Sequence, residues 1–117
     1  MISAIGNTIS ALNAYVTGLN VKANNIANAD SEDYKKSRAT YIEGENGDVT
    51  VEISKVGLES ELLAMSGTDT TAEPIPSNVE LAEEIPSMMV DQNGFEANLS
   101  VIKTKDQMLG TILDIIA

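Results

Sequence analysis

The stretch MISAIGNTISALNAYVTGLNVKANNIANA, residues 1–29, decides how the rest of the chain can fold. Its apolar residues recur at alternating steps of three and four, an average close to the 3.5-residue period of a helix that packs along one partner helix. They form the N-terminal stripe: Ile2, Ile5, Ile9, Leu12, Val16, Leu19, Ala23 and Ile26. An ordinary amphipathic helix on a small core would show similar spacing. We predict a long first helix that packs against another helix.

The other positions of this stretch carry almost no charge. Lys22 is the only charged side chain, and small residues and six Asn fill most of the rest. A helix face that contacts water normally carries charged residues. Small uncharged residues instead let neighbouring backbones approach closely. We therefore expect this helix to be packed on more than one side, most easily within an assembly of many chains.

The composition of the 117-residue chain excludes several functions. The chain is 43% hydrophobic and 21% charged, as in an ordinary single domain, but only 3% aromatic, which is little for a globular enzyme. It has no His and no Cys, so it lacks the commonest general base and the thiolate nucleophile. No Asp or Glu lies in an apolar surround that would raise its pKa for acid–base catalysis. We expect no enzymatic activity and no cofactor.

The charge balance restricts the possible partners. Eighteen acidic and seven basic residues give a net charge of -11, which opposes binding to nucleic acid and to anionic lipid. No run of eighteen apolar residues is present, and residues 1–10 lack the basic start of a secretory signal. We expect no nucleic-acid partner and no direct membrane insertion. If the chain leaves the cytoplasm, we expect export without a cleaved signal peptide.

The first helix is expected to end between Asn28 and Ser31, where its stripe stops. Asn28 suits a helix end because Asn tolerates the left-handed conformation. An acidic group, Asp30, Glu32 and Asp33, follows directly. The group lacks the spacing and central Gly of a calcium-binding loop, so a metal site is not favoured.

The pattern beyond residue 34 predicts a β-hairpin. Residues 49–54 alternate apolar and polar side chains, and residues 39–42 can pair with them. Between these segments, Asn46-Gly47 is a pair typical of tight turns that need positive φ angles. A two-stranded hairpin alone is marginally stable in water. We therefore expect the hairpin to lean on a helix.

Residues 57–77 are expected to connect the hairpin to a second helical region. Leu58, Leu62 and Met65 have helical spacing and could form two turns. Residues 66–77 have the composition of a linker, with two Pro residues near its end.

A second stripe with the same spacing runs through residues 78–117. Nine of its eleven positions are apolar, and the two polar ones would fix the register of pairing at some cost in stability. Asn78 is the expected N-cap. Pro86 is expected either to kink the helix or to place its start near Ser87. The C-terminal stripe consists of Leu81, Ile85, Met88, Gln92, Phe95, Leu99, Ile102, Asp106, Leu109, Leu113 and Ile116.

These elements predict a mainly α fold in three segments. Residues 1–33 form the N-terminal helix and a loop, residues 34–77 a short outer hairpin and linker, and residues 78–117 the C-terminal helix. The two long helices are expected to pair as an antiparallel-type coiled coil or helical hairpin.

Motifs at both ends of the chain resemble the signatures of flagellar basal-body rod and hook proteins. The first helix carries GLNV at 18–21 and ANNIANA at 23–29, and YK follows at 34–35. The second carries NVEL at 78–81, FEAN at 95–98, VIKT at 101–104 and DQMLGT at 106–111. Asp33 differs from the family, which usually has Gly before the Tyr. The short middle of the chain is most similar to the proximal rod subunits of the FlgC type.

The resemblance implies a structural subunit of the bacterial flagellar basal-body rod. In that family the terminal helices pair in the wall of an axial tube, which transmits torque and passes export substrates, and subunits travel through the flagellar type III export apparatus. The implied partners are copies of the chain itself, other rod and hook axial proteins and the export apparatus, and the implied location is the periplasm-spanning rod. A small acidic helical adaptor or secretion chaperone is the alternative; it would close at a dimer, whereas an axial subunit continues to assemble.

The expected subunit interface combines the two stripes with the motif residues beside them. In the first helix it consists of Ile5, Ile9, Leu12, Val16, Leu19, Asn24, Asn25, Ile26 and Asn28. In the second it consists of Phe95, Asn98, Leu99, Ile102, Leu109 and Leu113.

Overall fold

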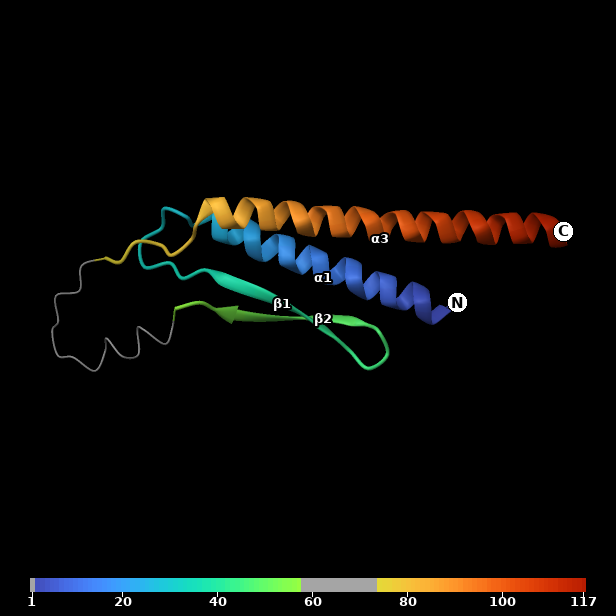
Figure 1. Cartoon of the computed structure of the whole chain (residues 1–117), viewed down its shortest axis with the longest axis horizontal. Coiled ribbons are helices and arrows are strands. Elements are labelled where there is room, and N and C mark those ends of the chain that lie inside the picture. Colours follow the sequence, from blue (N-terminus) through green and yellow to red (C-terminus); the bar gives the residue numbers. More distant parts are fainter. Residues whose placement is uncertain (1, 58–73) are drawn as a thin grey trace.

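The chain folds into two long helices with a β-hairpin between them (Figure 1). The computed structural model describes residues 2–57 and 74–117. Its elements are α1 (Ile2–Ala27), β1 (Ser37–Glu43), β2 (Val49–Lys55) and α3 (Leu81–Ile116). The expected mainly helical fold is confirmed. The expected helical turns at Leu58, Leu62 and Met65 lie outside the described residues.

The two helices lie side by side and run in opposite directions (Figure 1). Asn25 near the end of α1 bonds to Glu84 near the start of α3, and Lys22, one turn earlier in α1, pairs with Asp91 further along α3. With 36 residues against 26, α3 continues past the N-terminal end of α1. The last turns of α3 therefore have no α1 beside them.

The contact between the helices is centred on small and polar residues beside the two apolar stripes. The buried side chains of α1 include Ala14, Val21 and Asn25, and those of α3 are Glu84 and Asp91. The stripe residues are half-buried or exposed: Leu12, Leu19, Phe95 and Ile102 are half-buried, whereas Ile9 is 48% exposed, Leu99 50% and Leu113 66%. Small side chains let the helices approach, and polar side chains join them by hydrogen bonds. The expected pairing of the helices is confirmed.

The start of α3 differs from the expected one. Asn78 does not cap it: its Oδ1 accepts a hydrogen bond from the Lys36 N–H at 2.6 Å, and its Nδ2 donates to the Val56 carbonyl at 3.0 Å. Glu80 occupies the N-cap without a side-chain cap bond. The helix does not begin near Ser87 but continues through Pro86. Asn78 thus ties the base of the hairpin instead of capping a helix.

The hairpin matches its expectation. β1 and β2 pair antiparallel, with Tyr41 opposite Val51. The Gly44 N–H donates to the Asp48 carbonyl at 2.8 Å, which closes the turn. Gly47 has a φ of 77°, a left-handed conformation that glycine adopts without a Cβ clash. The Asn-Gly pair therefore plays the role that its composition indicated.

The hairpin also leans on α1, as expected. Near its turn, the Asn7 side chain donates to the Asn46 carbonyl at 2.9 Å, and the Val49 N–H donates to the Ser10 hydroxyl at 3.0 Å. These bonds fix the tip of the hairpin against the N-terminal half of α1.

Asn28 does not end α1 by adopting the left-handed conformation, as was expected. The helix ends at Ala27, and the Asn28 side chain donates to the Asn24 carbonyl at 2.8 Å. Among the described non-glycine residues, only Asp33 has a positive φ, at 59°. Its N–H donates to the Ile75 carbonyl at 2.7 Å, and its Oδ1 accepts from the Ile75 N–H at 3.0 Å. The left-handed residue therefore stands five positions after Asn28.

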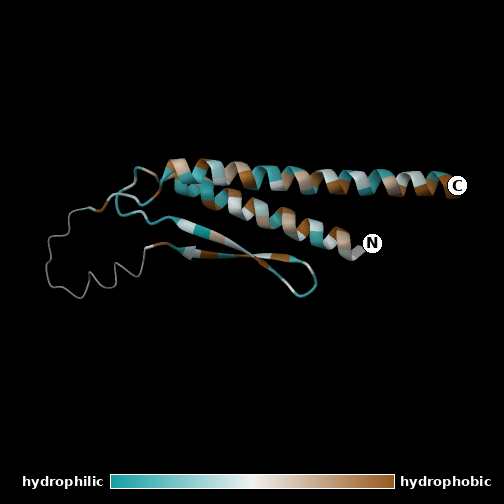
Figure 2. Cartoon of the chain, viewed as in Figure 1, coloured by the Kyte–Doolittle hydropathy of each residue, from teal (hydrophilic) through white to brown (hydrophobic). Residues whose placement is uncertain are grey.

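Apolar residues lie on the outside along both helices and both strands (Figure 2). None of the helices within residues 2–57 and 74–117 is long and apolar enough to cross a membrane.

Candidate subunit interface

One buried amide joins four parts of the chain. Asn25 is 1% exposed. Its Nδ2 donates to the Ser37 carbonyl at 2.8 Å and to Glu84 Oε2 at 3.1 Å. Its Oδ1 accepts from the Tyr34 hydroxyl at 3.1 Å and from the Ser37 N–H at 2.9 Å. Because every donor and acceptor is used, this side chain fixes α1, the following loop, β1 and α3 relative to one another.

A second polar cluster lies further along the helices. Asp91 on α3 is 4% exposed and pairs with Lys22 Nζ of α1. It also accepts a hydrogen bond from the Tyr41 hydroxyl of β1. Burial raises the pKa of Tyr41 above its ordinary value, and the hydrogen bond and negative charge of Asp91 raise it further. The cluster connects α1, β1 and α3 through one carboxylate.

Two glycines make this close approach possible. A Cβ at Gly18 would lie 2.7 Å from Asp91 Oδ2 and 3.0 Å from Tyr41 Cζ. A Cβ at Gly94 would lie 2.5 to 2.8 Å from atoms of the Tyr15 side chain. The Tyr15 ring in turn packs against the Tyr41 ring, with centroids 5.6 Å apart. Glycine disfavours a helix, and here its presence in both helices has a steric reason.

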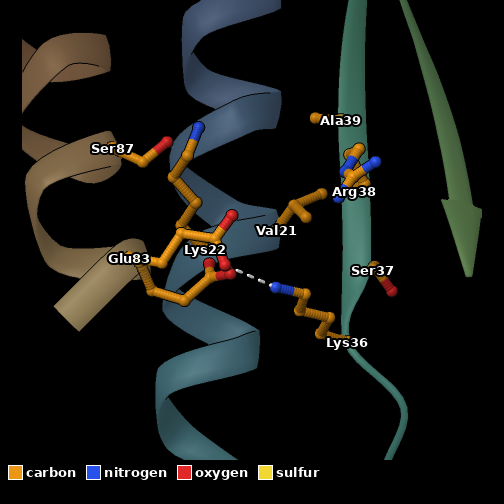
Figure 3. Close-up of a pocket in the computed structure, with 9 residues that line it drawn as sticks. Val21, Lys22, Lys36, Ser37, Arg38, Ala39, Glu83 and Ser87 are labelled. Carbon is orange, nitrogen blue, oxygen red and sulfur yellow. Dashed lines mark hydrogen bonds and ion pairs between the residues drawn. The ribbon is translucent and has the colours of Figure 1, made fainter. Parts of the chain in front are cut away.

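A small cleft lies where α1, β1 and the start of α3 meet (Figure 3). Lys36 is buried beside it, and its Nζ donates to Glu83 Oε2 at 2.8 Å. This hydrogen bond and the charge of Lys36 hold the pKa of Glu83 below its usual range. The cleft measures about 90 Å³, well below the roughly 300 Å³ at which small-molecule sites begin. Its charged residues Lys36 and Glu83 pair with each other and join β1 to the start of α3.

The apolar N-terminal stripe faces away from the hairpin. Ala14 lies on the side of α1 next to β2. Because successive helix residues are separated by about 100°, Ile9 lies about 140° and Val16 about 160° around the helix from Ala14. Ile9 and Val16 are 48% and 42% exposed, while Ile5, Leu12, Leu19 and Ile26 are half-buried. This face is therefore available for contacts outside the chain.

The exposed apolar surface of α3 is larger. Its last three turns carry residues that α1 does not cover, with Met108 60%, Leu113 66% and Ile116 76% exposed. The two buried side chains of this helix, Glu84 and Asp91, are both acidic. Such an arrangement, with polar contacts inside and apolar residues outside, is typical of a chain that buries surface against others.

Comparison with known proteins identifies the C-terminal segment. Residues 77–115 match the family described as "Flagellar basal body rod FlgEFG protein C-terminal". This segment is therefore similar to the C-terminal part of flagellar rod proteins, which are structural proteins.

Two flagellar hook proteins are among the relatives. FlgE of Escherichia coli (strain K12) is 39% identical over 49 residues, which cover 42% of this chain and 12% of that protein. FlgE of Treponema pallidum (strain Nichols) is 31% identical over 81 residues, which cover 69% of this chain and 16% of that protein. The chain therefore spans less than a fifth of the length of these flagellar relatives.

The structure divides the expected interface residues into inner and outer ones. Asn25 is enclosed by its own chain and cannot reach another subunit. Asn24 and Asn28 bond to each other at 3.1 Å, and Asn98 donates to the Gly94 carbonyl of its own helix at 2.9 Å. The apolar stripe residues remain open or half-buried. In the stretch ANNIANA, residues 23–29, Asn24, Asn25 and Asn28 thus bond within the chain, while Ile26 belongs to the N-terminal stripe.

Sequence reasoning missed the residues that hold this fold together. Tyr34, Tyr41, Asp91 and Asn78 were not expected to connect the helices with the hairpin. Lys22 offered one signal, because it is the single charge in an otherwise uncharged helix and a buried charge needs a partner. Its partner lies 69 residues away, so no local pattern could identify it.

Proposed function

We propose that this chain is a structural subunit of the flagellar basal-body rod that assembles through its two terminal helices. One observation carries the proposal: although polar side chains join α1 and α3, apolar stripe residues of both helices stay exposed, with Ile9 at 48%, Leu99 at 50% and Leu113 at 66%. Apolar residues that the fold leaves exposed are available to neighbouring copies. The family of the C-terminal segment and its hook relatives agree with this function.

The exposed stripes offer enough free energy for assembly. Full burial of one Leu or Ile side chain contributes about 1.5–3 kcal/mol. Ile9, Leu99, Leu109 and Leu113 are each 37% to 66% exposed in the isolated chain. Burying a few such residues against each neighbour would offset the loss of freedom that association costs.

The layout of the subunit follows from the same proposal. Residues 1–33 and 78–117 would form the axial core, and residues 34–77 would lie outside it, with the side of the hairpin next to α1 within reach of a neighbouring copy. The axial core forms the tube that transmits torque and passes export substrates. Contacts that do not close on themselves then extend a helical assembly instead of ending at a dimer.

We further propose a position in the rod instead of the hook, most like the proximal rod subunits of the FlgC type. The short segment between the two flagellar motifs supports this position. The partners would be copies of this chain, neighbouring rod and hook proteins and the flagellar type III export apparatus, and the location would be the periplasm-spanning rod.

The test is association as a function of concentration. Sedimentation velocity and electron microscopy of the 117-residue chain should show assemblies that grow as concentration rises. A species that stops at a dimer would instead support the alternative of a small acidic adaptor or secretion chaperone. In cells that carry the chain in their flagella, Leu99→Asp should abolish motility and recovery of rods, and Ser100→Asp should not.

A further inference from the structure

A groove runs between α1 and the hairpin on the side of Tyr41. It measures about 320 Å³ and is lined by Ala11, Ala14 and Tyr15 of α1 and by Tyr41 and Val49 of the hairpin. The short side chains of Ala11 and Ala14 leave the space, and the two tyrosine rings, 5.6 Å apart, form one wall. Within the described residues, nothing fills this groove. It could accept bulky apolar side chains.

The groove has an acidic border. Glu43 is the charged residue that lines it, and Gly47 of the turn lines it as well. Glu45 and Asp48 lie in the same turn. In the part of the chain that the structure describes, the carboxylates of Glu43, Glu45 and Asp48 take part in no ion pair. A partner that inserts here would need apolar residues with positive charge beside them.

The end of α3 has this combination. Lys105, Met108, Leu109 and Ile112 lie around one apolar depression on the helix. Met108 is 60% exposed and Ile112 44%. Across residues 2–57 and 74–117, neither Lys103 nor Lys105 has an ion-pair partner.

The other five basic residues are less suited to this role. Lys22 and Lys36 are held in the ion pairs of the fold, and Lys35 and Arg38 do not lie on a helix. Lys55 lies over the Tyr34 ring, 5.1 Å from its centroid, and donates to the Lys35 carbonyl. The basic charge that accompanies an exposed apolar helix face is therefore that of Lys103 and Lys105.

We propose that the end of α3, residues 103–112, docks into the groove between α1 and the hairpin of a second copy of this chain. This inference rests on the proposed self-assembly and names the surfaces that it uses. Met108 and Ile112 would enter beside Tyr15 and Tyr41, and Lys105 would lie near Glu43. The docked helix end would bury apolar surface that the isolated chain leaves in water.

The two surfaces belong to different parts of the molecule. A helix is rigid, and the end of α3 lies beyond the N-terminal end of α1, so a copy cannot fill its own groove (Figure 1). Each copy would therefore donate one helix end and accept another. Such a heterologous contact continues from copy to copy in one direction. It would supply the open-ended growth that an axial structure needs.

Disulfide trapping tests this contact, since the chain contains no Cys of its own. Chains with Ala11→Cys are mixed with chains carrying Met108→Cys at a concentration at which they assemble, and are then oxidised mildly. We expect a cross-linked dimer of the two chains at several times the yield of a control mixture. The control combines Met108→Cys with Glu52→Cys, an exposed position on β2.

Charge reversal gives an independent readout. Glu43→Lys and Lys105→Glu should each raise the concentration needed for half-assembly by about twofold to fivefold, the size expected for an exposed ion pair. Mixing or combining the two changes should restore part of the loss, and Glu52→Lys should have less effect.

Assembly without preferential cross-linking between positions 11 and 108 would overturn this docking while leaving the proposed function intact. A chain that stays monomeric at all concentrations would contradict both.

Discussion

The Asn25 amide of α1 donates a 3.1 Å hydrogen bond to the Glu84 carboxylate of α3, and the two side chains are only 1% and 7% exposed. This contact replaces the apolar packing that two amphipathic helices usually show. Asn25 also forms two hydrogen bonds with Ser37, the first residue of β1. A polar residue thus occupies the place of a core residue, while apolar residues such as Ile9 and Leu99 stay exposed.

Replacing Asn25 should be the most damaging single change in the helix pair. Asn25→Ala leaves the Ser37 backbone, the Tyr34 hydroxyl and Glu84 without a buried partner. We expect a loss of unfolding free energy on the order of 3 kcal/mol, because each unsatisfied buried group costs about 1–3 kcal/mol. Urea unfolding followed by circular dichroism measures it. Asn24→Ala, at the exposed neighbour, is the matched control, and equal losses would show that Asn25 is not the joint of the fold.

Two glycines of α1 should respond to alanine with opposite signs. A Cβ at Gly6 meets no atom within 4 Å, so Gly6→Ala should stabilise the helix by about 0.5–1 kcal/mol. Gly18→Ala places the Cβ 2.7 Å from Asp91 Oδ2 and should destabilise by about 1–3 kcal/mol, the cost of overpacking. The denaturation midpoints of the two variants test this. If both midpoints rise, the contact of Gly18 with Asp91 and Tyr41 is less tight than the structure shows.

Position 33 should accept only residues that tolerate a positive φ and whose side chain can accept a hydrogen bond. Asp33→Asn keeps both properties at φ 59° and should leave stability within about 0.5 kcal/mol of the parent. Asp33→Ala adds a strain of about 1–2 kcal/mol and removes the side-chain bond to the Ile75 N–H. Thermal unfolding compares the two. Equal stability of the Asn and Ala variants would contradict the conformation at this turn.

The apolar stripes should separate assembly from folding. Leu99 is 50% exposed in the chain, so Leu99→Asp should change the unfolding free energy of the monomer by less than about 1 kcal/mol. It should nevertheless abolish assembly, because a neighbour would bury an unpaired carboxylate. Ser100→Asp is the adjacent, off-stripe control. A variant Leu99→Asp that assembles like the parent would remove this stripe from the subunit interface.

Thr8 needs separate treatment in such a series. It lies one residue off the N-terminal stripe and, from the sequence alone, resembles a mild control position. In the structure its side chain is only 9% exposed, and its hydroxyl donates to the Ala4 carbonyl at 2.8 Å. Thr8→Asp should therefore destabilise the monomer itself, and it does not serve as a control for assembly.

The unfolding free energy at alkaline pH should reflect the ionisation of the Tyr41 hydroxyl. Its pKa is raised in the folded state, so the folded state binds the proton more tightly than the unfolded state does. The resulting stabilisation is complete below the unfolded pKa of about 10 and is lost as the pH rises through the folded value. We expect unfolding free energy to fall above about pH 10. Tyr41→Phe should flatten this part of the profile.

Absorbance at 295 nm gives a direct check of the same group. The chain has three tyrosines. The difference between the titration curves of the parent and of Tyr41→Phe isolates the Tyr41 signal. We expect this signal to titrate above the ordinary value of about 10 and to coincide with unfolding. Titration of Tyr41 at or below pH 10 would contradict the contact of its hydroxyl with Asp91.

The sequence alone determined the elements and the class of this protein. The alternation of three and four located both helices, and Asn46-Gly47 located the hairpin turn, because these signals depend on residues that are neighbours in the chain. The motifs at residues 78–111 indicated the flagellar family. The lack of His and Cys indicated a protein without the usual catalytic groups.

Only the tertiary structure decided which faces meet and which residues join them. A stripe of apolar residues shows that a face will be covered, but periodicity does not say whether the cover is the second helix of the same chain or another copy. The joint between α1 and α3 depends on Asn25 with Glu84 and Lys22 with Asp91, pairs separated by 59 and 69 residues. It also depends on Gly18, whose missing side chain admits Tyr41 and Asp91. Hydrogen bonding and close approach across such separations are set by the fold, and no local pattern in the sequence contains them.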